Sequence, residues 1–143
     1  MNRRWLNWFG VGLFFVGFYI FTASPISNND HTVMLINKYK FLSSLDLTLL
    51  NKIIRKAAHL LSFGLLALTI RNAIYPYRWT YPGAWLLATL YGASDEVHQI
   101  FVPGRTPLLS DVMIDSLGAF LALYILYFLK LRKENRSNIP GTQ

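Results

Sequence analysis

Long apolar runs constrain the fold of this chain more than any other feature. They cover residues 5–23, 55–74, 83–101 and 110–131, and a helix of about 20 mostly apolar residues crosses the hydrocarbon core of a bilayer. Only 15% of the 143 residues are charged, against about 25% in soluble domains. The pattern predicts an all-α, polytopic membrane protein in which a single domain has four transmembrane helices.

The first run has a second interpretation. Arg3 and Arg4 precede it and the small residues of TAS follow it, as in a cleaved signal peptide. The apolar run is long for such a peptide, and Pro25 lies just after the most plausible cleavage point. We therefore favour a retained membrane anchor.

The segment between the first two runs, residues 24–52, carries apolar residues at helical spacing. The positions, which extend into the next run, are Leu35, Tyr39, Leu42, Leu45, Leu49 and Ile53. Lysines lie between them, so the spacing predicts an interfacial amphipathic helix between the first two spans. A partly ordered loop is the alternative.

Basic residues give the chain a formal charge of +7. Because they flank apolar runs, we expect them to meet anionic lipid, and we predict no nucleic-acid partner. The N-terminus, residues 71–78 and residues 130–143 hold 2 + 2 + 4 = 8 Lys and Arg, and the opposite side holds the other 6 of the 14. The positive-inside rule therefore predicts that both termini are cytoplasmic, with residues 132–143 as a basic tail.

Most of the acidic residues would meet at one membrane face. With four spans, the start of the second, the end of the third and the start of the fourth share a face. These segments read RKAAH, SDEVHQ, PGR and SDVMID, and they hold four carboxylates, three Lys or Arg side chains and two histidines. Intramembrane charges are costly unless they face one another or water. The sequence therefore predicts a polar pocket between helices that opens at one surface.

Small residues share a helix face with these acidic residues. The positions are Ala84, Ala88, Gly92 and Glu96 on the third run, and Asp111, Asp115, Gly118 and Ala122 on the fourth. Small residues let helix backbones approach closely in lipid. We expect Glu96 and Asp115 to face the bundle interior, each with a cationic or histidine partner.

Several of these residues also have simpler interpretations. Asp111 can complement the dipole of the fourth helix. Arg105 follows a Pro–Gly turn and can contact a lipid phosphate. Asp95 points about 100° away from Glu96 around the helix, so it is either a surface carboxylate or part of the pocket. His98 can lie at the interface.

Two stretches resemble the VanZ-like family of small bacterial membrane proteins. They read RKAAHLLSFGLLAL and SDEVHQIFVPGRTPLLSDVMIDSLGA, and the resemblance covers about residues 53–125. The matched positions are Lys56, His59, Glu96, Gln99, Arg105, Asp111, Asp115 and Gly118. The family often has an acidic residue and a tyrosine where this chain has Ser62 and Phe63, which argues against a role that needs a carboxylate or a phenol there. The resemblance implies a four-span protein of the bacterial cell envelope, linked to resistance to the glycopeptide teicoplanin, and it implies no particular biochemical activity.

Three classes of function fit these residues. The favoured hypothesis is binding of membrane lipid or an anionic, lipid-linked cell-wall precursor. Its predicted ligand-binding residues are Arg55, Lys56, His59, Glu96, Gln99, Arg105, Asp111 and Asp115. The second is a membrane-embedded hydrolase or transferase in which His59 and Glu96 or Asp115 act as general acid and base. The third is proton-coupled transport, for which four spans would need a homo-oligomer.

Metal binding has weaker support in the sequence. Two histidines and several acids can hold a divalent ion, but the chain has no cysteine and no HExxH spacing. We therefore predict neither a metal nor a cofactor.

Overall fold

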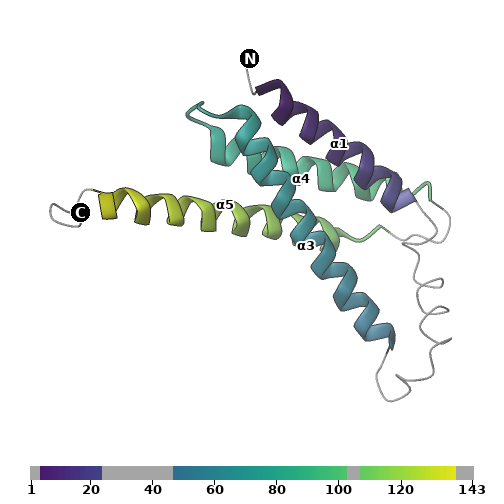
Figure 1. Cartoon of the computed structure of the whole chain (residues 1–143). Helices are drawn as coiled ribbons and strands as arrows, with labels where there is room; N and C mark the ends of the chain where they lie inside the picture. The colour runs from purple at the N-terminus through teal and green to yellow at the C-terminus, as the bar shows by residue number, and fades with distance from the viewer. Residues whose placement is uncertain (1–3, 24–46, 103–106, 138–143) are drawn as a thin grey trace.

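The computed structural model describes residues 4–23, 47–102 and 107–137, and these residues form helices without any strand. The helices are α1 (Arg4–Ala23), α3 (Leu47–Ile74), α4 (Thr80–Gln99) and α5 (Leu109–Ser137) (Figure 1). The all-α prediction is confirmed for this part of the chain.

Two stretches of helix are long and apolar enough to cross a membrane. They are Lys52–Ile74 and Leu109–Ser137, while the apolar stretch of α1, Trp5–Ile20, is shorter. In α4 the polar residues of its last turns, which include Asp95 and Glu96, lower the hydropathy of the helix. The four-span arrangement therefore remains a prediction.

Two predicted boundaries differ from the observed helices. α3 begins at Leu47, before the predicted residue 55, so Leu49 and Ile53 continue α3 and do not belong to a separate interfacial helix. Residues 24–46 of that predicted helix lie outside the described residues. α5 continues to Ser137, into the predicted tail, because no glycine or proline interrupts it after Gly118.

A pair of glycines brings α3 and α5 together. A Cβ added to Gly64 would lie 3.2 Å from the carbonyl oxygen of Gly118, and one added to Gly118 would collide with the carbonyl of Leu60. Small residues allow such a close approach of backbones. Because Arg55 contacts Asp111 near the starts of the same two helices, α3 and α5 run in the same general direction.

α1 and α4 run in the opposite direction. Asn7, near the start of α1, donates to the carbonyl of Asn72 near the end of α3. Glu96, near the end of α4, reaches Leu108 just before α5. We call the region where α3 and α5 begin and α4 ends the polar end. The aromatic end is the opposite region, where α1 and α4 begin and α3 ends.

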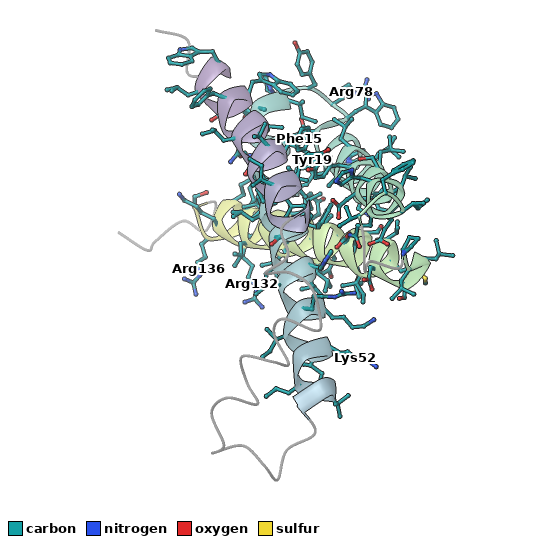
Figure 2. The ribbon with its side chains drawn as sticks, turned by 90° about the vertical axis from the view of Figure 1, so that its right-hand side faces the viewer. Phe15, Tyr19, Lys52, Arg78, Arg132 and Arg136 are labelled. Atoms are coloured by element: carbon teal, nitrogen blue, oxygen red, sulfur yellow. The ribbon has the colours of Figure 1, made fainter. Side chains whose placement is uncertain are left out.

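The core is centred on α3. Its buried apolar side chains, among them Phe63, Leu66 and Ile70, pack against small buried residues of α4 and α5. The C-terminal half of α5 continues beyond the other helices (Figure 1). Arg132 and Arg136 project from this half (Figure 2).

Candidate functional site

Asp111 joins two cations at the polar end. Its Oδ2 lies 3.2 Å from the Arg55 guanidinium, and its Oδ1 lies 3.7 Å from Lys56 Nζ. The Asp111 side chain is 5% exposed, whereas those of Arg55 and Lys56 are 25% and 46% exposed. A buried carboxylate therefore holds two cations at the edge of the bundle, with part of each accessible from outside.

His59 and Asp115 form a second pair, one helical turn further inside. His59 Nδ1 lies 3.0 Å from Asp115 Oδ1, and Asp115 has no exposed surface. Aromatic rings surround the histidine: Phe18 meets it edge-on at 5.7 Å and Phe63 stacks at 6.3 Å. The imidazole is thus held in one orientation by a carboxylate and two apolar rings.

The second oxygen of Asp115 faces a glycine. Oδ2 is buried and has no hydrogen-bond partner among the described residues. A Cβ added to Gly92 would lie 3.0 Å from this oxygen and 3.2 Å from a ring carbon of Phe63. Gly92 therefore provides the space in which the carboxylate of α5 lies against α4.

Three polar side chains at the end of α4 complete the cluster. The Gln99 amide donates to Asp95 at 2.8 Å and to Glu96 at 3.3 Å. The other oxygen of Glu96 accepts a 2.7 Å hydrogen bond from the backbone N–H of Leu108. Glu96 thus satisfies a backbone donor that would otherwise lack an intrahelical partner at the start of α5.

The polar end brings together all the predicted ligand-binding residues that the structure describes. They are Arg55, Lys56, His59, Glu96, Gln99, Asp111 and Asp115. Arg105 lies outside the described residues. Glu96 and Asp115 are both buried, as predicted, and Asp115 has the expected histidine partner. The hydrogen bonds of Glu96 within the described residues are to an amide and a backbone N–H, so its cationic or histidine partner stays a prediction.

Asp95 and His98 lie near the end of α4, and the burial of Asp95 decides between its two interpretations. Asp95 is 4% exposed, so it belongs to the buried cluster and is not a surface carboxylate. The sequence feature that could have predicted this burial is the spacing of Asp95 from Gln99, because side chains four residues apart on a helix are neighbours. His98 is half-buried, with its ring 4.2 Å from that of Tyr19 on α1.

The arrangement offers charge and proton-transfer groups more readily than a metal site. In residues 4–23, 47–102 and 107–137, no three histidine or acidic side chains lie where they could share a metal ion. The cluster instead presents two accessible cations, buried carboxylate acceptors and one oriented imidazole. Such groups can bind an anion that also carries hydrogen-bond donors, or move a proton.

Comparison with known proteins identifies the family of the chain. A family model described as VanZ/LLP1 matches residues 6–130, most of the chain. The chain belongs to the VanZ/LLP1 family. Searches of curated proteins and of solved structures found no match. Family membership and the two long apolar helices together indicate a membrane protein.

Proposed function

We propose that this VanZ/LLP1 protein binds an anionic, lipid-linked component of the bacterial cell envelope at its polar end. The observation that carries the proposal is the pairing of Arg55 and Lys56 with one buried carboxylate, Asp111. The pairing orients both cations and leaves part of each exposed. Phosphate oxygens accept strong, charge-assisted hydrogen bonds from such groups.

The carboxylates have a complementary role in this proposal. The described cluster contains four of them, Asp95, Glu96, Asp111 and Asp115, against two Lys or Arg side chains. A simple anion would not favour that balance. The excess of carboxylates instead suits a ligand that joins a phosphate to sugar hydroxyls or peptide amines, because those groups donate hydrogen bonds to carboxylates. A lipid-linked cell-wall precursor has this combination.

The cellular setting follows from the family and the charge distribution. We place the protein in the bacterial cell membrane as a four-span protein with both termini cytoplasmic, and we extend to it the family's link with teicoplanin resistance. The 8-to-6 count of basic residues supports the orientation. A reporter fused after Asn135 that is active only outside the cell would contradict it.

Binding of a polyprenyl diphosphate–disaccharide to the purified full chain in nanodiscs tests the proposal. Replacing Arg55 by Gln should weaken binding about tenfold or more, because a hydrogen bond to a charged group contributes about 1.5–3 kcal/mol. Lys52→Gln is the matched control. Lys52 is an exposed cation of α3 one turn before Lys56 (Figure 2), and its loss should leave binding unchanged. Equal affinity of the Arg55→Gln and Lys52→Gln variants would refute the proposal.

A second candidate function is proton transfer by His59. Its carboxylate partner and its two aromatic neighbours fix the ring, as a general base in a hydrolase or transferase requires. Hydrolysis of the diphosphate of the same lipid probe, which yields polyprenyl phosphate and disaccharide phosphate, would favour this candidate if it were abolished by His59→Gln and retained in Lys52→Gln. A proton flux that depends on His59 in vesicles containing an oligomer would instead favour coupled transport.

A further inference from the structure

A groove lies between α4 and α5 at the aromatic end, away from the cluster described above. Its volume is about 360 Å³, and its lining is almost wholly apolar. The lining includes Tyr81, Pro82 and Trp85 of α4 and Phe120, Tyr124 and Tyr127 of α5. The volume falls within the range of about 300–1,000 Å³ that is usual for small-ligand sites.

Two contacts bound the groove along the helices. Toward the polar end, Trp85 Nε1 donates to Ser116 Oγ at 3.1 Å. Toward the other end, the rings of Tyr81 and Tyr127 meet edge-on at 5.5 Å. Beyond this point α5 leaves the bundle (Figure 1). The groove is therefore an elongated apolar site with tyrosine at its outer end.

Arg71 of α3 packs against the tyrosine that lines the outer end of the groove. Its guanidinium carbon lies 5.2 Å from the Tyr81 ring centroid and 5.0 Å from that of Tyr75. Its other contacts are with the side chains of Asn72 and Tyr81. Its Nε is buried and has no hydrogen-bond partner among the described residues.

Within the described residues, no acidic side chain balances the charge of Arg71. No carboxylate of the described residues forms an ion pair with Arg71. The sequence from Arg71 to Ser94 has no acidic residue, and it includes a second cation, Arg78, in the turn before α4. A cation partly removed from water favours an anionic partner. Here the anion must sit beside an apolar groove.

We propose that the groove holds one acyl chain of an anionic phospholipid whose phosphate meets Arg71. The apolar lining of the groove suits the acyl chain, and Arg71 suits the phosphate. Tyr81 both lines the groove and contacts Arg71. The site is at the opposite end of the bundle from the proposed precursor site and does not depend on it.

Native mass spectrometry of the delipidated full chain tests whether the charge of Arg71 contributes to lipid binding. Phosphatidylglycerol should bind about fivefold more tightly than phosphatidylcholine, because its headgroup is anionic whereas the choline of the other lipid offsets the phosphate charge, and one cation near anionic lipid contributes about 1 kcal/mol. Arg71→Gln should remove this preference, and Arg71→Lys should retain it. Arg132→Gln is the matched control, because Arg132 also stacks on an aromatic ring, that of Phe128 at 4.6 Å, but lies outside the groove. Equal binding of the two lipids by the wild-type protein would overturn the proposal.

A second variant tests the groove itself. Tyr124 is 57% exposed, so Tyr124→Ser should fold normally while placing a polar group in the lining. The affinity for both lipids should fall by the same factor, roughly threefold. Ile125→Ser, at a similarly exposed neighbour outside the groove, should have no effect. Unchanged lipid binding by Tyr124→Ser would overturn the proposal, as would lipid-free dimers that this substitution dissociates, since the groove would then hold a second copy of the chain.

Discussion

The two ends of this bundle handle positive charge in opposite ways. At the polar end, Arg55 and Lys56 share the buried carboxylate of Asp111. At the aromatic end, Arg71 lies over two tyrosine rings with no carboxylate bonded to it among the described residues. Of the described acidic residues, all but Glu134 lie at the polar end. The described part of the chain therefore concentrates its carboxylates at one end and places an arginine beside an apolar groove at the other.

This difference has an energetic side. Buried ion pairs contribute little net stability, but removal of one partner is costly because the other is left unpaired. A cation on aromatic rings at a part-exposed site contributes about 0.5–1 kcal/mol, and its loss leaves no orphaned charge. Substitutions at the polar end should therefore be the more damaging, and their effects should depend on which partners are changed together.

The largest effect is expected for His59→Leu. The substitution leaves Asp115, which has no exposed surface, without its histidine partner, so the free energy of unfolding should fall by about 3–5 kcal/mol. The double variant His59→Leu/Asp115→Leu should recover most of this loss. Denaturant titration in detergent micelles measures both. A double variant as unstable as the single one would remove the distinction between the two ends.

A smaller loss is expected where α3 and α5 meet, between the two ends. The added methyl of Gly118→Ala collides with the Leu60 carbonyl, and such overpacking costs about 1–3 kcal/mol. Gly12→Ala in α1 is the control, because its Cβ would meet no atom within 4 Å. The same titration should show this control to be neutral or slightly stabilising. Equal losses for the two variants would mean that the close approach of α3 to α5 does not limit stability.

The smallest effect is expected at the aromatic end, for Trp85→Phe. It removes the indole hydrogen bond to Ser116 and keeps an aromatic ring at the groove, so we expect a loss of about 0.5–1.5 kcal/mol. Trp79→Phe, at a side chain that is 76% exposed, should lower the free energy of unfolding by less than Trp85→Phe does, and the melting temperatures of the two variants measure this difference. If Trp85→Phe were more damaging than His59→Leu, the contrast between the ends would be wrong.

Much of the polar end was predictable because two simple constraints agree. The small-residue stripe that ends in Glu96 is buried, as its four-residue period predicts, and the alternation of helix direction brings the three polar segments to one end. These constraints depend only on helical geometry and on the cost of charge in an apolar environment. They therefore identified the cluster without any knowledge of its individual contacts.

The individual contacts needed the structure. Asp95 is buried although it points away from Glu96, because the end of α4 buries two adjacent faces. Glu96 accepts a hydrogen bond from the backbone N–H of Leu108, a contact that no residue pattern predicts. The groove at the aromatic end depends on where α5 diverges from α4, which the positions of aromatic residues in the sequence do not reveal.

The spacing of the paired residues also fixes the register of α3 against α5. Arg55 and His59 are four residues apart, as are Asp111 and Asp115, and the two pairs match in order. A slip of α5 by one turn would place His59 opposite Asp111 and leave Asp115 opposite Phe63, a fully buried ring. Helices that insert first and associate afterwards must find their alignment, to which the close contacts of Gly64 and Gly118 also contribute. The carboxylates make the misaligned state costly, so they select the native alignment during assembly, whatever ligand the finished protein binds.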